Sequence, residues 1–113
     1  MDRPIASAEA QDRYERIASD LVDSIGATPG KMMGMPTLCL AGKAFAGLFG
    51  DAMVFKLDGG AHAAALALPE AALFDPSGMG RPMKAWVRVP LEAATEWPSL
   101  AVAAAQNLSS SGT

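Results

Sequence analysis

The stretch KMMGMPTLCLAGKAFAGLFGDAMVFKL, residues 31–57, decides the fold of this chain. Its short apolar runs are interrupted at Met35-Pro36, at Ala41-Gly42-Lys43 and at Gly50-Asp51. Such punctuation is typical of consecutive strands joined by tight turns. The stretch therefore predicts an antiparallel meander. A sheet of this kind must bury at least one apolar face against the amphipathic segments on either side of it.

Four strands are predicted within the meander, at residues 31–34, 37–40, 44–49 and 52–57. Side chains alternate between the two faces of a sheet. Alternation in the fourth strand puts Met53, Phe55 and Leu57 on one face, and Val54 and Lys56 on the other. One face of the sheet is thus predicted to be the more apolar.

The third strand is predicted to present Phe45, Gly47 and Phe49 on one face. Because glycine has no side chain, Gly47 leaves a gap in that face. We expect a large neighbouring side chain or another backbone segment to fill it.

An amphipathic helix is predicted before the meander, with Ser7 as its N-cap and Gly26 as the residue that ends it. Its apolar stripe contains Tyr14, Ile17, Ala18, Leu21, Val22 and Ile25. Its other side carries the i,i+4 pairs Glu9–Arg13 and Asp12–Arg16. A turn at Thr28-Pro29-Gly30 then leads into the sheet.

After the meander the pattern predicts a short helix over 61–68, capped by Asp58 and closed by Pro69. Residues 69–84 read mostly as loop, and a fifth strand over 85–89 is stopped by Pro90. A last helix, capped by Thr95, packs beside the first. Its apolar stripe consists of Trp97, Leu100, Ala101, Ala104 and Leu108.

These elements predict a two-layer α+β fold in the order α-β-β-β-β-α-β-α. The antiparallel sheet has four to five strands, and the helices pack on one face of it. A length of 113 residues suits one domain. We expect that domain to span 8–108, between a flexible N-terminus at 1–7 and a flexible tail at 109–113.

The composition limits the classes of function. A net charge of -3 argues against a surface that binds nucleic acid mainly by neutralising phosphates, although a local basic patch keeps nucleic acid as an alternative. The single cysteine excludes an intrachain disulfide. No apolar run approaches the roughly 20 residues that span a bilayer, and no leader is recognisable. We expect a cytoplasmic protein without a membrane partner.

The residues with catalytic or metal-binding potential stand apart from one another. His62 lies among alanines, and Cys39, the only cysteine, lies in an apolar strand, so neither has the partners that a metal or a nucleophile requires. We expect a helix-surface or capping histidine and a small buried hydrophobe. The carboxylates of helix one, at Asp12, Glu15, Asp20 and Asp23, are expected on its exposed side. The sequence predicts no catalytic residue, no metal and no cofactor.

Four segments together are similar to a known family: GKMMGMPTLCLAGKAFAGL, DAMVFKL, LFDPSGMGRPMKAWVRVP and EWPSLAVAA. Over residues 10–108 the chain resembles the N-terminal domain of the TfoX/Sxy proteins. The resemblance implies a two-layer α+β fold related to YjbR-type domains and secretion chaperones. It also implies a regulatory role, because the named members regulate natural competence and assist a transcription factor. Those members carry a second, C-terminal domain after this one.

A group of cations around an aromatic residue is the most specific candidate site: Lys56, Arg81, Lys84, Trp86 and Arg88. Cationic groups beside an aromatic ring suit an anion or the carboxylate of a partner. The alternative is that these cations extend into water or pair with Asp75 and Glu92. The seven methionines likewise fill gaps in the core or form an adaptable binding surface.

The function expected from these features is non-catalytic binding of a protein partner or of a second copy of the chain. An apolar patch at Leu38, Leu40, Phe45 and Phe49 on the helix-free face of the sheet would serve such an interface. The alternatives are a nucleic-acid-binding module and a domain that binds a small anionic ligand at the 75–88 loop.

Overall fold

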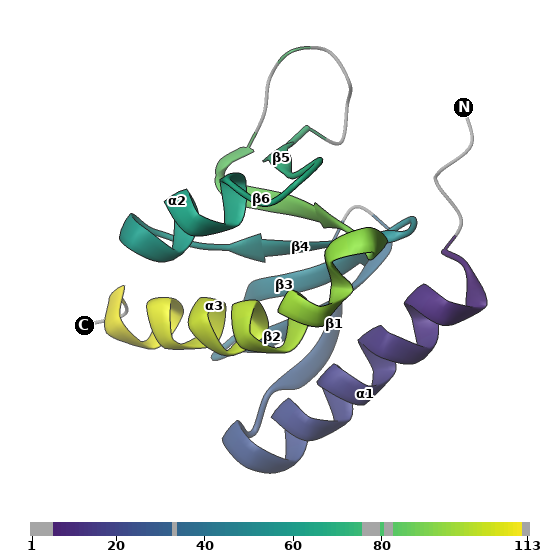
Figure 1. Cartoon of the computed structure of the whole chain (residues 1–113). Coiled ribbons are helices and arrows are strands. Elements are labelled where there is room, and N and C mark those ends of the chain that lie inside the picture. Colours follow the sequence, from purple (N-terminus) through teal and green to yellow (C-terminus); the bar gives the residue numbers. More distant parts are fainter. Residues whose placement is uncertain (1–5, 33, 76–79, 81–82, 112–113) are drawn as a thin grey trace.

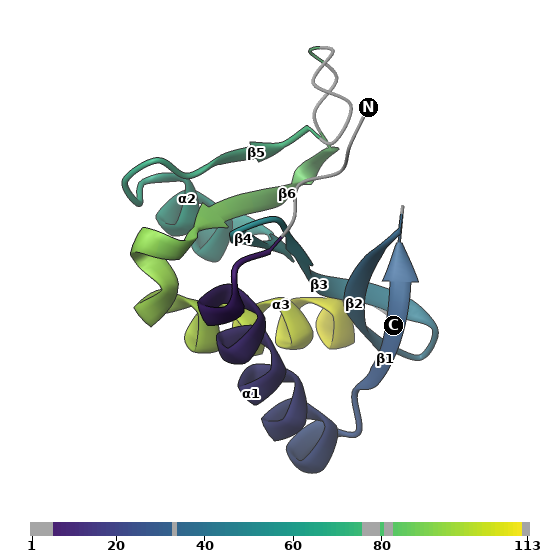
Figure 2. The ribbon, with the colours of Figure 1, turned by 90° about the vertical axis from the view of Figure 1, so that its right-hand side faces the viewer.

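Six strands form one antiparallel sheet, and three helices cover one of its faces (Figures 1 and 2). The computed structural model describes residues 6–32, 34–75, 80 and 83–111, with the backbone alone for 109–111. The elements in chain order are α1 (Ala8–Ile25), β1 (Thr28–Met32), β2 (Met35–Leu40), β3 (Lys43–Phe49), β4 (Ala52–Lys56), α2 (Gly59–Leu66), β5 (Ala72–Phe74), β6 (Met83–Pro90), the 3-10 helix η1 (Leu91–Glu96) and α3 (Trp97–Ser111). The spatial order of the strands is β1-β2-β3-β4-β6-β5. The predicted α+β class is confirmed, with more strands than expected.

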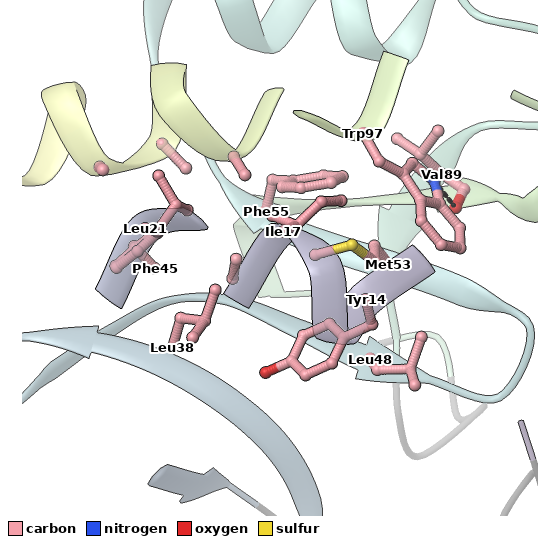
Figure 3. Close-up of a cluster of buried hydrophobic side chains, with 14 of the residues drawn as sticks. Tyr14, Ile17, Leu21, Leu38, Phe45, Leu48, Met53, Phe55, Val89 and Trp97 are labelled. Atoms are coloured by element: carbon pink, nitrogen blue, oxygen red, sulfur yellow. Dashed lines mark hydrogen bonds between the residues drawn. The ribbon is translucent and has the colours of Figure 1, made fainter. Parts of the chain in front are cut away.

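The main core lies between the sheet and the helices (Figure 3). As predicted, Met53, Phe55 and Leu57 all belong to it, because β4 is a regular central strand with neighbours on both sides. Trp97, at the start of α3, is fully buried there, and its indole N–H donates a hydrogen bond of 3.2 Å to the Val89 carbonyl. That bond satisfies the one polar atom of the indole ring.

Helix α1 has the predicted ends and the predicted ion pairs. The Ser7 hydroxyl accepts a hydrogen bond from Ala10 N, and Gly26 ends the helix with a φ of 73°. The i,i+4 pairs have N–O distances of 3.2 Å for Arg13–Glu9 and 3.1 Å for Arg16–Asp12. None of the described helices is long and apolar enough to cross a membrane.

The predicted stripe of α1 is too wide at its end. Tyr14, Ile17 and Leu21 are buried, whereas Val22 and Ile25 are 39% and 44% exposed. The C-terminal end of α1 lies away from the sheet (Figure 2), so its last turn has less to pack against. The predicted turn at 28–30 is also wrong, because these residues belong to the edge strand β1.

A register shift between Leu38 and Cys39 changes the direction of Phe45. On β3, Ala46 pairs with Leu38 and Ala44 with Cys39, so Phe45 is an extra residue, a β-bulge. Phe45 therefore joins the helix-side core, and the prediction that it shares a face with Phe49 is wrong.

The apolar patch expected on the helix-free face is corrected for the same reason. Leu38 and Phe45 are buried on the helix side, Leu40 packs against the same core, and only Phe49 lies on the helix-free side. The helix-free face instead carries a smaller cluster of buried side chains, namely Met35, Val54, Phe74 and Trp86. Within it, Phe49 meets Phe74 edge to face at 5.0 Å between ring centroids.

The C-terminal half differs from the prediction at several points, among them the end of α2 at Leu66 and the start of β6 at Met83, each two residues earlier than predicted. A short strand, β5, lies within the predicted loop and pairs with β6 at the edge of the sheet. Helix α2 begins two residues before the predicted start, directly after its N-cap Asp58. Thr95 is no cap, since it lies within η1. Helix α3 follows from Trp97 and continues to Ser111, past Leu108, the last residue of the predicted apolar stripe.

The β2–β3 turn contains a strained residue. Ala41 and Gly42 have φ values of 52° and 80°, the pattern of a type I′ hairpin turn. Asn adopts this conformation more readily than Ala. Ala41→Asn is expected to raise the free energy of unfolding by about 1 kcal/mol in urea denaturation. Ala63→Asn on the exposed side of α2 is the control and should lower it; a loss of stability in both variants would contradict the prediction.

The gap at Gly47 is filled as predicted, by a neighbouring side chain and by backbone. A Cβ atom at Gly47 would lie 2.6 Å from Met35 Cε and 3.0 Å from the Pro36 carbonyl oxygen. Gly47→Ala should therefore reduce the free energy of unfolding by about 1–3 kcal/mol. Gly60→Ala is the matched control, because nothing lies within 4 Å of its Cβ position. Equal stability of both variants would show that the Gly47 contact is not a constraint.

Candidate functional site

Strand pairing brings three of the predicted site residues together on the helix-free face. Lys56 on β4 is the cross-strand neighbour of Trp86 on β6, and Val54 is the neighbour of Arg88. Val54 and Trp86 belong to the helix-free cluster, so alternation places Lys56 and Arg88 on the same side. We call Lys56, Trp86 and Arg88 the cationic face.

The two cations of this face are half-buried beside apolar groups and form no salt bridge with any residue that the structure describes. Trp86 is 6% exposed and Val54 is fully buried, so the stems of Lys56 and Arg88 lie along apolar surface. In the described part of the chain, every salt bridge lies on α1, and neither Lys56 nor Arg88 takes part in one. The expected pairing with Glu92 is therefore not formed. A guanidinium and an ammonium in this position can bind an anionic group of a ligand or partner.

Of the other two predicted members, Lys84 is not assigned to this group and Arg81 is not among the described residues. Lys84 is exposed, and both Met83 and Trp86 contact the helix-free cluster although they are three residues apart. Strict alternation thus breaks between them and does not assign the Lys84 side chain to this face. Asp75, the other expected partner, accepts a hydrogen bond of 2.9 Å from Gly80 N.

His62 and Cys39 are both partly buried and lie apart from the cationic face. His62 Nε2 lies 2.8 Å from the Lys84 carbonyl oxygen, a contact that ties α2 to β6. Cys39 is half-buried, with Sγ 3.8 Å from Thr37 Oγ1. Among the described residues, no group of His, Cys, Asp and Glu is arranged to hold a metal ion. Neither residue therefore adds a second reactive group to a site.

The methionines serve mainly as packing residues where the structure describes them. Met35 and Met53 are buried, one on each side of the sheet. Met32 and Met83 pack in part against the helix-free cluster. Met33 and Met79 lie outside the described residues.

A cavity of about 410 Å³ that sequence reasoning missed lies between the start of α1 and the turns of the sheet. Tyr14 and Glu15 of α1 line it on one side, and Met35, Leu48 and Phe49 of the sheet line it on the other. Figure 3 shows the Tyr14 side chain reaching from α1 toward the sheet, between Leu38 and Leu48. Its size falls within the range of small-molecule sites.

One hydrogen bond joins the chain neighbours of two cavity-lining residues, Ala6 and Gly50. The Asp51 carboxylate, at the β3–β4 turn, accepts a bond of 2.6 Å from Ser7 N, the N-cap residue of α1. The sequence predicts both residues as a cap and a turn, but their contact joins positions 44 residues apart and carries no local signal. A smaller hollow of about 240 Å³ lies on the other side of the same turn, lined by Arg88, Asp51 and Glu92.

The hydroxyl of Tyr14, the only tyrosine, has a raised pKa, chiefly because burial disfavours the phenolate and secondarily because of the Cys39 thiol. The folded state thus holds its proton above the unfolded value of about 10. Stability from this group is complete below that value and falls as pH rises beyond it, by up to about 1.4 kcal/mol per pH unit.

We expect phenolate absorbance to appear in alkali only together with unfolding measured by circular dichroism. Tyr14→Phe, whose ring packs alike, should show a shallower loss of stability between about pH 10 and 11. Phenolate absorbance at the usual pKa in the folded protein would contradict this.

No family model, no curated protein and no solved structure matches this chain. The functional proposal accordingly depends on what the described residues can do chemically. The cationic face offers two half-buried cations beside Trp86, and the cavity at Tyr14 offers an apolar pocket with a polar mouth.

Proposed function

We propose that this chain is a non-catalytic, cytoplasmic interaction domain of the type found at the N-terminus of TfoX/Sxy proteins. It binds a protein partner, or a second copy of itself, through the helix-free side of its sheet. The observation that carries the proposal is the placement of Lys56 and Arg88 beside Trp86, with no salt bridge to either cation among the described residues.

The cations of this surface are better matched by an acidic group of a partner than by bulk water. The guanidinium of Arg88 offers a planar fork of donors that matches a carboxylate, and the neighbouring apolar side chains exclude water from such a pair. Arginine and aromatic residues are the side chains that contribute most at interfaces. The half-buried Phe49, which contacts Phe74, extends the apolar part of the same side.

The resemblance to the TfoX/Sxy N-terminal domain supports a regulatory role. The two-layer α+β architecture agrees with what that resemblance implies. A domain of this class acts by docking on another protein, which in the named members of the family concerns natural competence and transcription.

Nucleic acid is the second candidate, since the same two cations suit phosphate groups beside an aromatic ring. A net charge of -3 opposes it, because most of the affinity for nucleic acid comes from phosphate neutralisation. The acidic side chains of α1, among them Asp12, Asp20 and Asp23, add to this repulsion. We therefore favour protein.

Charge reversal tests the proposal. Lys56→Glu with Arg88→Glu should weaken partner binding or self-association by roughly 30-fold or more, because a buried charge would face an acidic partner without compensation. Binding is measured by capture from extracts of the native host with quantitative mass spectrometry, and self-association by light scattering on a sizing column. Circular dichroism checks that this double variant and its control are folded.

The matched control is Lys31→Glu with Lys43→Glu, which changes the net charge equally at exposed positions on β1 and β3. It should retain the partner. Identical partners and masses for both double variants would overturn the proposal. Capture that disappears with nuclease or with rising salt would favour the nucleic-acid alternative instead.

A further inference from the structure

The cavity beside Tyr14 is lined by apolar side chains at its base and by polar groups on its α1 side. Met35, Leu48 and Phe49 come from the sheet, and Gln11, Tyr14 and Glu15 come from α1. It is separate from the cationic face, because neither Lys56 nor Arg88 lines it. An apolar base with a few polar groups is the usual composition of a small-molecule site.

The polar groups on the α1 side supply hydrogen-bond acceptors. Tyr14 is 7% exposed, yet its hydroxyl bonds to no residue that the structure describes. Its oxygen keeps a small contact with solvent at the cavity, since no fully buried polar side-chain atom in the described part lacks a partner. The amide N–H₂ of Gln11 donates to the Ala6 carbonyl at 3.0 Å, which leaves its oxygen as an acceptor.

The charge around the cavity is negative. Glu15 is exposed at its edge and forms no ion pair within the described residues. The two arginines of α1, Arg13 and Arg16, are paired with Glu9 and Asp12 and do not line the cavity. Among the residues that the structure describes, no cation lines the cavity to hold an acidic ligand.

The start of α1, which would otherwise attract an anion, already has acceptors in place. Asp51 accepts from Ser7 N, and the Ser7 hydroxyl accepts from Ala10 N. The Ser7 carbonyl in turn accepts from Gln11 N. The negative groups that the dipole favours thus belong to the protein itself.

From this arrangement we propose that the cavity binds a small organic amine, with its ammonium group at Glu15, Gln11 and Tyr14 and its apolar group against Met35, Leu48 and Phe49. An ammonium donates three hydrogen bonds and accepts none, which matches a lining of acceptors. An aryl or branched alkyl group fills the apolar base. This site shares Met35 and Phe49 with the helix-free side of the sheet, but its polar groups are separate from Lys56 and Arg88 of the cationic face.

Three probes of nearly the same shape test the charge preference: phenethylammonium, 2-phenylethanol and phenylacetate. Each is titrated into the isotope-labelled full chain, and amide shifts are followed by NMR up to about 10 mM, above the millimolar Kd typical of weak fragments. We expect phenethylammonium to shift Gly34, Leu48 and Gly50, to bind more tightly than the alcohol, and to leave the carboxylate as the weakest of the three.

Conservative variants locate the bound amine. Glu15→Gln should raise the Kd of phenethylammonium about three- to fivefold, the size of an exposed ion pair, and should not change that of 2-phenylethanol. Tyr14→Phe should raise the Kd of phenethylammonium about threefold or more. Asp23→Asn, exposed on the same helix but outside the cavity, is the control and should bind as the wild type does.

Three outcomes would overturn the inference: no binding of any probe, equal or preferred binding of phenylacetate, or a Glu15→Gln variant that binds the amine as tightly as the wild type. Lys56 and Arg88 are unchanged in the cavity variants. Capture of the protein partner by each of these variants is therefore measured in parallel. A failure at the cavity with partner binding retained would leave the proposed function standing.

Discussion

The packing of small side chains of α3 against aromatic side chains of the sheet is the contact on which the rest of the fold depends. Ala101 and Ala104 are fully buried, and α3 contacts β2, β3, β4 and α1. Alanine lets the helix backbone lie close to the sheet, while Phe45 and Phe55 supply the volume that fills the layer. A larger residue at either alanine would force α3 away from the sheet. This displacement would also break the hydrogen bond from Trp97 to the Val89 carbonyl.

The direction of the aromatic side chains could be predicted from alternation in β4 but not in β3. Met53, Phe55 and Leu57 follow a strict period of two in a regular central strand, so their direction could be predicted. The direction of Phe45 depends on a bulge, which exists only in relation to the partner strand. No local feature of 44–49 distinguishes a bulged strand from a regular one.

The edges of the fold escaped prediction for a similar reason. Residues 28–32 and 72–74 carry turn formers or are very short, and they become strands because a neighbouring strand offers hydrogen bonds. Val22 and Ile25 have the right spacing for a buried stripe, but whether they are covered depends on how α1 lies over the sheet. Local propensity predicts an element and its period, whereas coverage is a tertiary property.

The candidate site shows the same limit. Sequence reasoning could group Lys56 with Trp86 and Arg88 by assuming that their strands are close, and the β4–β6 pairing meets that assumption. It could not assign Lys84, because the alternation of β6 breaks between Met83 and Trp86. Sequence reasoning could not predict the cavity, because its walls come from three separate segments: α1, residues 34–36 and residues 48–50.

The β3–β4 turn connects these two parts of the surface. Phe49 and Gly50 line the cavity at Tyr14 and also the hollow beside Arg88, while Asp51 holds the start of α1. A substitution at Phe49 would alter both sites and also the contact with Phe74, so its effect could be assigned to neither. Glu15 and Arg88 each line only one of the two hollows. Substitutions at Glu15 and at Arg88 therefore distinguish binding in the cavity from binding on the cationic face. Neither substitution removes the Phe49 packing that the two hollows share.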